Sequence, residues 1–481
     1  MVGPYRDLII TTKFMAKPVL TLKAMRSWEA DSWAQGILEE DVIARVGQRI
    51  GERIMESSAP GDAILLLAGK GHNGDDVRAA CSWISDRKIT LINLRQPASQ
   101  ITCLDKALSD LPDLIVEGLF GIGLNRSLEG SWEDVVNRIN ACPVRTVAID
   151  IPSGLDPDDG KPQGATIRAD QTWTVGAVKK GMLASGASEY VGRLEIFGDV
   201  GLAELDDHQS DLYFGIPSDF CTPPFSRPVE SHKGNHGCTM LFAGSCGYHG
   251  AAVLAARGAT KARPGLVALA THEPAYLAIA SQLQNVMVHP VKKLLLIPPK
   301  ATSVVIGPGL ASSELPLELR SQVVEVWETF PAPVVIDASA LDWLPSAGGP
   351  QDALRVITPH PGEAARLLGC KAHDVQSDRV KALRSLSDKF GNCHIVLKGH
   401  QTLIGTSTGP VYVNPSGNPS LAQGGSGDIL AGFIGGLLAQ ETWATDPLMA
   451  LRYGVWVHGN AADICETQHD SWEFDQLLDC M

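Results

Sequence analysis

The feature that most constrains the fold is a repeated alternation of short aliphatic runs with helix-like segments. From residue 60 onward each run ends in a Gly-rich or Asp-rich turn. The runs are AILLLAGKG, DLIVEGLFGIG, TVAIDIPSG, TMLFAGS, SVVIGPG, PVVIDAS, VITPHPGE and IVLKGHQT. Buried strands that alternate with helices indicate a parallel sheet covered on both faces. The sequence therefore predicts an α/β protein whose ligands bind at the carboxyl ends of the strands, where these turns lie.

A Pro- and Ser-rich segment at residues 215–231, GIPSDFCTPPFSRPVES, interrupts this pattern. It has the period of neither a helix nor a strand, which is typical of a linker. A chain of 481 residues is long enough for two self-sufficient cores. We therefore expect two α/β domains, at residues 1–221 and 222–481.

Charge and composition exclude several classes of partner. The net charge of −14 lacks the basic footprint of proteins that bind nucleic acid or anionic membranes. The 10 cysteines are scattered without CxxC pairs, which is typical of reduced thiols in the cytoplasm. The apolar stretch at residues 429–439 is too short to span a membrane and predicts a buried helix. We expect a cytoplasmic protein with no nucleic-acid or membrane partner.

Three turns in the first half follow strands of one predicted sheet. They are GKGHNGDD at residues 69–76, FGIGLNRS at 120–127 and DIPSGLD at 150–156. Glycines let the backbone approach an anion, and amides at the start of a following helix can bind phosphate. One such turn alone could be a plain strand-to-helix connection, but three at one sheet edge predict a cleft. Asp150 is either a general acid/base of that cleft or the cap of its own turn.

The three turns resemble motifs of the NAD(P)H-hydrate epimerase family, and MRSWE (25–29), VGAVKKGM (175–182) and YVGRLEIFGDVG (190–201) extend the resemblance over nearly the whole first domain. It implies a Rossmann-like three-layer α/β/α domain that interconverts the R and S hydrates, with Asp150 catalytic. It also implies a potassium ion held by Asn73, Glu117 and Ser153. The residues that it places against the hydrate are His72, Asn73, Gly74, Asp75, Asp76, Gly121, Ile122, Gly123, Leu124, Asn125, Arg126, Ser127 and Asp150.

Three residues depart from that family's pattern. His72 replaces an Asn, Asp75 replaces a Gly, and Glu117 replaces the cation-ligating Asp. Glu117 keeps the charge but is one methylene longer, so the cation position is expected to shift. A Gly position can require a positive φ, which Asp adopts less freely. If residue 75 needs that conformation, Asp75 would distort the site and count against epimerase activity. The alternative is a non-catalytic nucleotide-binding or dimerisation module.

Two motifs in the second half open helices. TPHPGEAARLLG at residues 358–369 presents His360 and has Glu363 in the first helical turn. GGSGDILAGFIGGLLAQ at 424–440 has glycine amides at a helix start, which form an anion hole, and Asp428 at the same end. Such a loop stabilises charge on a transferred phosphoryl group while the Asp takes a hydroxyl proton. Asp428 could instead be a simple helix cap.

GGSGD resembles the anion-hole and base motif of ribokinase-like kinases. With residues 232–256, 304–311, 358–369 and 396–402 it makes this half similar to ADP/ATP-dependent NAD(P)H-hydrate dehydratases. The resemblance implies a ribokinase-like α/β domain, Mg²⁺, and ADP or ATP as co-substrate, with ADP favoured. Asp428 is then the catalytic base. The residues assigned to the hydrate are Gly309, His360, Pro361, Gly362, Glu363, Ala364, Ala365, Arg366 and Asp428. Those assigned to the nucleotide are Lys398, Gly399, His400, Gln401, Thr402, Asn418, Gly424, Gly425, Ser426 and Gly427.

The two resemblances together predict a metabolite-repair enzyme for damaged nicotinamide cofactors. The first domain would convert the R hydrate to S, and the second would dehydrate the S form. The expected substrates are NADHX and NADPHX with ADP or ATP, and we expect a homo-oligomer. A sugar or vitamin-precursor kinase is the rival hypothesis. It would share GGSGD, but it would explain neither TPHPGE nor the first domain.

Overall fold

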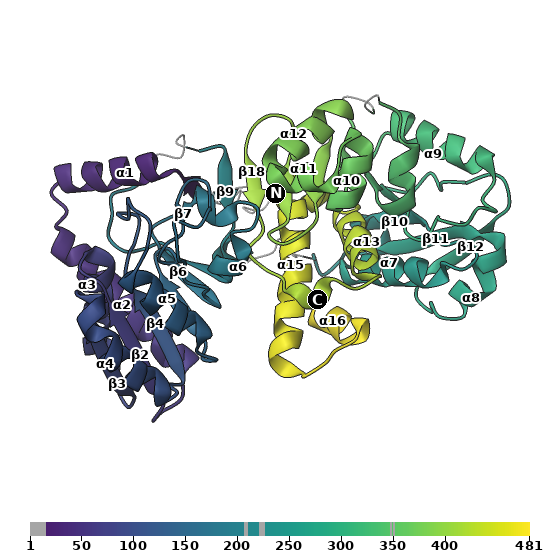
Figure 1. Cartoon of the computed structure of the whole chain (residues 1–481). Coiled ribbons are helices and arrows are strands. Elements are labelled where there is room, and N and C mark those ends of the chain that lie inside the picture. Colours follow the sequence, from purple (N-terminus) through teal and green to yellow (C-terminus); the bar gives the residue numbers. More distant parts are fainter. Residues whose placement is uncertain (1–15, 206–209, 221–226, 347–348, 350–351) are drawn as a thin grey trace, which may run out of the picture. The chain divides into compact units, whose positions relative to one another are not determined.

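The computed structural model describes residues 16–205, 210–220, 227–346, 349 and 352–481. The chain divides into two compact units, Ala16–Phe214 (the N-terminal unit) and Gly215–Met481 (the C-terminal unit) (Figure 1). The boundary expected between residues 221 and 222 falls within residues 221–226, outside the described part of the chain. The compact C-terminal unit begins earlier, at Gly215.

The N-terminal unit contains, in chain order, β1 (Lys17–Leu20), α1 (Leu22–Ala34), α2 (Glu39–Ser57), β2 (Ala63–Ala68), α3 (His72–Ala80), β3 (Lys88–Asn93), α4 (Pro97–Ser109), β4 (Leu114–Gly118), α5 (Ser131–Ala141), β5 (Thr146–Ile149), β6 (Gln171–Val175), β7 (Val178–Lys179), α6 (Ser188–Val191), β8 (Arg193–Phe197) and β9 (Leu212–Phe214).

Its main sheet has six strands in the order β3-β2-β4-β5-β6-β8, and every neighbouring pair is parallel. Alternate side chains of the strands enter two separate cores. Leu66 packs with Ile50 of α2 on one face, whereas Leu65 packs with Val135 of α5 on the other. The predicted three-layer α/β/α arrangement is therefore confirmed. One local expectation was wrong: α3 already begins at His72, so the HNGDD residues lie inside the helix rather than before it.

The C-terminal unit contains β10 (Cys238–Phe242), α7 (His249–Lys261), β11 (Leu266–His272), α8 (Tyr276–Ala280), β12 (Met287–Val291), β13 (Ser303–Ile306), α9 (Leu317–Thr329), β14 (Val334–Ile336), β15 (Arg355–Ile357), α10 (Pro361–Leu368), α11 (Ala372–Ser377), α12 (Arg379–Lys389), β16 (His394–Leu397), β17 (Leu403–Gly405), β18 (Val411–Val413), α13 (Ser426–Leu438), α14 (Glu441–Ala444), α15 (Pro447–Gln468) and α16 (Phe474–Cys480).

The sheet of this unit runs β12-β11-β10-β13-β14-β15-β16-β17-β18. It is parallel as far as β16, but β17 and β18 are antiparallel. The expectation that IVLKGHQT leads from a strand into a helix was therefore wrong. Gly399 and Gln401 adopt φ of +134° and +53°, and these left-handed conformations reverse the chain into a hairpin.

Helix α13 is the buried helix that the apolar stretch predicted. It packs between α7 and α15, beside which it lies in Figure 1. A Cβ on Gly432 would lie 1.9 Å from the carbonyl oxygen of Ala255, so glycine permits the close approach of α13 and α7. Within the described residues, no helix is long and apolar enough to cross a membrane.

A buried ion pair ties the start of the C-terminal unit to its core. The Arg452 guanidinium on α15 donates to Asp219 Oδ2 at 2.5 Å, and both side chains are 2% exposed. The same guanidinium lies 4.1 Å from the Tyr412 ring centroid. Phe220 belongs to the hydrophobic core and stacks on Trp456 at 4.9 Å. Residues 215–220 are therefore part of this unit.

The Arg452–Asp219 pair predicts at which residue a stable fragment of the C-terminal unit must begin. A fragment of residues 215–481 should be more stable than one of 222–481 by at least about 3 kcal/mol, because the shorter one buries Arg452 without the Asp219 carboxylate. Chemical denaturation of both fragments measures the difference. Asp219→Ala in the longer fragment is the matched control and should reproduce most of the loss. Equal stability of the two fragments would show that the segment contributes nothing.

Candidate active sites

The turns after β2, β4 and β5 meet at one edge of the N-terminal sheet. A Cβ on Gly69 would lie 1.9 Å from the carbonyl oxygen of Leu119, so the first two turns touch through their backbones. A Cβ on Gly121 would lie 3.1 Å from Asp150 Oδ2 and 3.4 Å from Asn73 Cβ. Asn73 at the start of α3, Gly121 after β4 and Asp150 after β5 are thus brought together, as the parallel topology requires.

The three residues expected to hold a cation are all buried. Ser153 donates to Glu117 through its hydroxyl (2.7 Å, to Oε2) and its amide (2.9 Å, to Oε1). Asn73 Nδ2 donates to the Ile149 carbonyl at 3.0 Å. Its Oδ1 is buried and accepts no hydrogen bond from the described residues. A buried amide oxygen without a donor, a carboxylate and a hydroxyl are the kinds of oxygen ligand that a hard cation takes.

The charge state of Glu117 changes near neutral pH. Burial raises the pKa of this carboxyl to about 7, against the lowering effect of the Leu119 and Ser153 amides and the Ser153 hydroxyl. A cation attracts the ionised form, so the carboxyl is a better cation ligand above that pH than below it.

The departures at residues 72 and 75 do not distort the site. Asp75 lies in α3 without a positive φ, so the expected conflict at this position was wrong. Its carboxylate pairs with Arg78 at 2.6 Å, and Arg78 also donates to the Gly69 carbonyl at 2.9 Å. His72 is exposed and lies 3.0 Å from Glu39 Oε1. It is instead Asp150 that has a left-handed backbone, at φ +68°.

The loop at residues 121–127 lies at the mouth of this cluster and is only partly fixed. Gly123, Asn125, Arg126 and Ser127 are exposed. The Ile122 carbonyl accepts a hydrogen bond from Arg26 of α1 at 3.4 Å. These residues stay predictions as substrate contacts, because their side chains are not held against the buried cluster.

Sequence reasoning missed three charged partners of Asp150. Lys179, at the end of β7, is completely buried and its ammonium donates to Asp150 Oδ1. Burial, followed by the repulsion of Asp150, raises the pKa of Glu29 on α1 and raises that of Asp76 well above its usual range. Asp76 was assigned only to substrate contact. A lysine inside the apolar stretch of VGAVKKGM was the available signal.

The second site forms at the amino end of α13. Lys398 follows β16, and its Nζ lies 2.7 Å from Asp337 Oδ1 and 4.0 Å from Glu363 Oε2. A Cβ on Gly427 would lie 3.2 Å from the same ammonium. Gly427, like Lys398 assigned to the nucleotide, and Glu363, assigned to the hydrate, therefore both lie next to the Lys398 ammonium.

Electrostatics couple Asp428 to this group. The pKa of Asp428 is raised to about 7, chiefly by burial and then by the charges of Asp337 and Glu363, against the lowering effect of Lys398. Burial alone would lower the pKa of Lys398, but Asp337, Glu363 and Asp428 outweigh it and raise the pKa. Lys398 thus stays charged, while Asp428 can exchange a proton near neutral pH, as a general base requires.

A reciprocal capping box fixes the start of α10. His360 Nδ1 accepts hydrogen bonds from the amides of Gly362 (3.0 Å) and Glu363 (3.3 Å). Glu363 Oε2 in turn accepts from the His360 amide at 2.8 Å. His360 and Glu363 are therefore locked to each other, which sets the orientation of the Glu363 carboxylate.

The remaining predicted residues are less tightly joined to the cluster. Gly309 adopts φ +67°, and a Cβ there would lie 2.5 Å from the Tyr248 carbonyl oxygen. The Asn418 side-chain amide donates a hydrogen bond to Asp463 Oδ1 of α15 at 3.2 Å. Arg366 is exposed and pairs with Asp342 at 3.3 Å rather than with the cluster.

Comparisons with known proteins cover both units. A family model for NAD(P)H-hydrate dehydratase matches residues 239–479, and one for the YjeF-related protein N-terminus matches residues 86–181. A bifunctional NAD(P)H-hydrate repair enzyme from Coxiella burnetii is 33% identical over 92% of this chain and 93% of its own. The enzyme of that name from Escherichia coli is 35% identical over 83% of this chain and 80% of its own.

The chain belongs to the family of bifunctional NAD(P)H-hydrate repair enzymes. It is also similar to the crystal structure of an ADP/ATP-dependent NAD(P)H-hydrate dehydratase from Bacillus subtilis co-crystallized with ATP/Mg²⁺. That structure is 31% identical, covers 53% of this chain and 91% of its own, and has a TM-score of 0.46.

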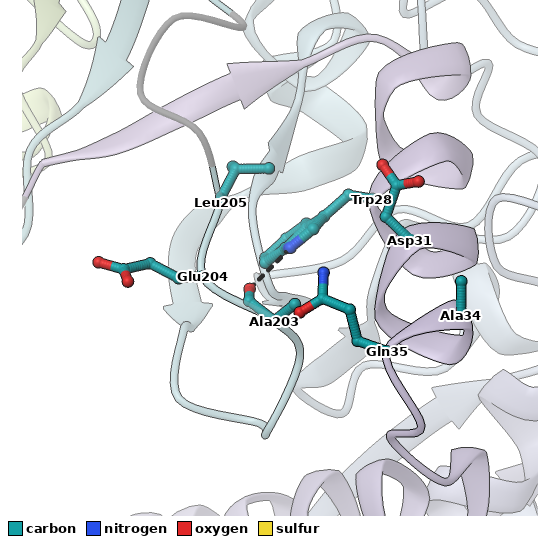
Figure 2. Close-up of a pocket in the computed structure, with 7 residues that line it drawn as sticks. All are labelled: Trp28, Asp31, Ala34, Gln35, Ala203, Glu204 and Leu205. Carbon is teal, nitrogen blue, oxygen red and sulfur yellow. Dashed lines mark hydrogen bonds between the residues drawn. The ribbon is translucent and has the colours of Figure 1, made fainter.

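A pocket of about 330 Å³ lies beside Trp28 in the N-terminal unit of this family member (Figure 2). The Trp28 indole crosses it and donates to the Ala203 carbonyl at 2.9 Å. The residues that line it are Trp28, Asp31, Ala34, Gln35, Ala203, Glu204 and Leu205. None of these described residues was predicted to contact substrate, nucleotide or cation.

Sequence reasoning missed Arg379, which the structure places against the turn after β16. It opens α12, and its guanidinium donates to the carbonyls of His400 (2.5 Å), Gln401 (3.1 Å) and Leu397 (3.1 Å). Burial lowers its pKa to about 10, so it remains charged at neutral pH. Arg379 therefore holds the hairpin turn that carries the predicted nucleotide contacts.

Replacing Arg379 should weaken nucleotide binding. We expect Arg379→Ala to raise the KM for ADP or ATP by about tenfold to 100-fold, because hydrogen bonds from a charged donor contribute about 1.5–3 kcal/mol. The turnover number should change less. Steady-state kinetics of the dehydratase reaction give both values.

Arg384 provides a matched control on the same helix. It donates to the carbonyls of Ser407 (3.2 Å) and Gly409 (3.1 Å) in the next hairpin. Arg384→Ala should leave the nucleotide KM close to that of the parent. Equal KM changes in the two variants would contradict a specific role for Arg379.

Proposed function

We propose that the N-terminal unit epimerises the R and S hydrates of NADH and NADPH, and that the C-terminal unit dehydrates the S hydrate with ADP or ATP. The observation that carries the proposal is the arrangement of Asp428, Lys398 and Glu363 at the start of α13 in a chain related to repair enzymes across both units. A kinase for another small molecule explains only the GGSGD motif. A cytoplasmic location and a homo-oligomeric state stay predictions.

Dehydration requires a better leaving group than hydroxide. Asp428 takes the proton of the hydroxyl on carbon 6, whose oxygen attacks the terminal phosphorus of the nucleotide and displaces AMP from ADP, or ADP from ATP. Amides of the glycine loop stabilise the charge on the transferred group. The ring nitrogen's lone pair then expels phosphate, and loss of a proton from carbon 5 restores the double bond of NADH or NADPH.

Mg²⁺ is supplied with the nucleotide in this proposal. Such ions are usually bound by one or two carboxylates together with substrate phosphates. Asp337 and Glu363, whose carboxylates flank Lys398, are the oxygen donors at this strand edge that fit the ion. Bound there, Mg²⁺ would neutralise phosphate charge while Lys398 binds the same group.

Epimerisation requires a bond at carbon 6 to open and close again on the other face. Asp150 takes the hydroxyl proton as the bond from carbon 6 to the ring nitrogen opens. The oxygen then forms an aldehyde, and the nitrogen keeps the electron pair and receives the proton. Closure on the opposite face reverses these steps and gives the other epimer. The position of Asp150 Oδ2 beside Gly121 supports this role.

We assign potassium to the site formed by Asn73, Glu117 and Ser153. The support is the buried Asn73 Oδ1, which has no donor among the described residues, and the buried carboxylate of Glu117, which accepts a hydrogen bond from the Ser153 hydroxyl. When bound, the ion would supply positive charge next to the reacting ring.

Asp428 can be tested through its pH dependence. With a pKa of about 7, its ionised form should make dehydratase kcat/KM rise between about pH 6 and pH 8. Asp428→Asn should lower turnover by about 10²-fold or more, whereas nucleotide binding survives because the glycine amides remain. Asp475→Asn, at an exposed ion pair with Arg257, is the control. Near-normal turnover of Asp428→Asn would exclude its role as the base.

Glu117 can be tested through potassium. Because its carboxyl has a pKa of about 7, potassium should activate R-to-S conversion more strongly at about pH 8 than at about pH 6. Glu117→Gln should raise the potassium concentration needed for half-maximal conversion and remove this pH effect. Glu117→Asp should retain both the activation by potassium and its dependence on pH. Conversion that ignores potassium in all three proteins would mean that the cation site is misassigned.

A further inference from the structure

Lys179 stands out because its charge is entirely removed from solvent. Its side chain is 0% exposed and all of its polar contacts lie inside the N-terminal unit. Besides Asp150 Oδ1, the ammonium donates to Thr174 Oγ1 and to the Val175 carbonyl, both at 2.9 Å. A buried ammonium is unfavourable unless every N–H bond has an acceptor, and here three acceptors match its three protons.

The two carboxylate oxygens of Asp150 have different surroundings. Oδ1 receives Lys179 and, at 3.4 Å, the Val175 amide. Oδ2 lies on the other side, 3.1 Å from the Cβ position of Gly121 and thus beside Asn73. With one oxygen held, rotation of the carboxylate is restricted and Oδ2 remains directed at the predicted cleft.

The surroundings of Asp150 make such a counter-charge necessary. Asp76 from α3 and Glu29 from α1 both interact unfavourably with its carboxylate. Like charges repel more strongly where solvent is excluded than in water. Lys179, from β7, is the cation that contacts Asp150 directly and offsets this repulsion.

We propose that Lys179 is a positioning residue of the epimerase, which binds Oδ1 of Asp150 so that Oδ2 can exchange a proton with the hydrate. The inference rests on the proposed epimerase function. Lys179 acts through Asp150 and contacts no reacting atom, so its loss should reduce turnover rather than substrate binding.

A double-mutant cycle in the full-length chain tests this role. The proteins are the parent, Lys179→Met, Asp150→Asn, and the variant with both changes. R-to-S conversion of purified R hydrate gives kcat and KM, thermal unfolding reports folding, and dehydration of S hydrate shows that the other unit is intact. Lys180→Met is the matched control, because Lys180 is the next residue and is exposed.

Lys179→Met should lower epimerase kcat by about 10²-fold, the loss typical of a missing general base, with KM within about threefold of the parent. The double variant should be no slower than Asp150→Asn, because two residues that act as one unit give non-additive losses. Lys180→Met should match the parent.

Two results would overturn the inference. One is a Lys179→Met variant with kcat within about threefold of the parent. The other is a double variant whose loss is the product of the two single losses, which would make the roles independent. If Lys179→Met fails to fold because it leaves the buried Asp150 carboxylate unpaired, the double variant, which lacks that carboxylate, is compared with Asp150→Asn. A double variant slower than Asp150→Asn would then overturn the inference, because Lys179 would act independently of Asp150.

Failure of the proposed function gives a different pattern. A parent that dehydrates S hydrate but never converts R hydrate, at any potassium concentration, would refute the epimerase and the role of Lys179 together. A parent that converts R hydrate normally while Lys179→Met does so equally well would refute the positioning role alone.

Discussion

An ion pair between a lysine and an aspartate lies at the centre of each site. Lys179 holds Asp150 in the N-terminal unit, and Lys398 holds Asp337 in the C-terminal unit. Parallel strands end at one edge of a sheet, so their polar residues gather where solvent is partly excluded. Removing a charge from water is costly unless it is paired, and the ion pair makes the remaining charges tolerable. Both arrangements follow from this one requirement.

The two ion pairs leave different groups ready for chemistry. Around Lys398 the carboxyl that remains is Asp428, whose pKa of about 7 suits proton transfer to and from a hydroxyl. Around Lys179 the paired residue itself, Asp150, has its second oxygen toward the cleft. In the C-terminal unit the proposed base, Asp428, is therefore a separate residue next to the ion pair. In the N-terminal unit the proposed base, Asp150, is itself a member of the ion pair.

Backbone contacts hold these charges in place. Gly69 lets the turns after β2 and β4 touch, and the His360–Glu363 capping box fixes a carboxylate beside Lys398. Arg379 binds the carbonyls of Leu397, His400 and Gln401, on both sides of Lys398. Such contacts restrict the approach geometry of the reacting groups, which is a large part of what an enzyme contributes to rate.

The sequence by itself determined the α/β class, the convergence of the three N-terminal turns and the buried helix α13, because hydrophobic periodicity and glycine positions are local properties. Asp428 and Asp150 could be singled out because they lie within such motifs, whereas Asn73 was singled out only through the resemblance to the epimerase family. Only the tertiary structure decided that the Lys398 turn is a hairpin, that Asp75 is helical, and that Lys179 and Arg379 serve the sites. These last two act through partners 29 and about 20 residues away in the chain. Which charges are buried and paired depends on distance and desolvation in three dimensions, and no local pattern encodes either.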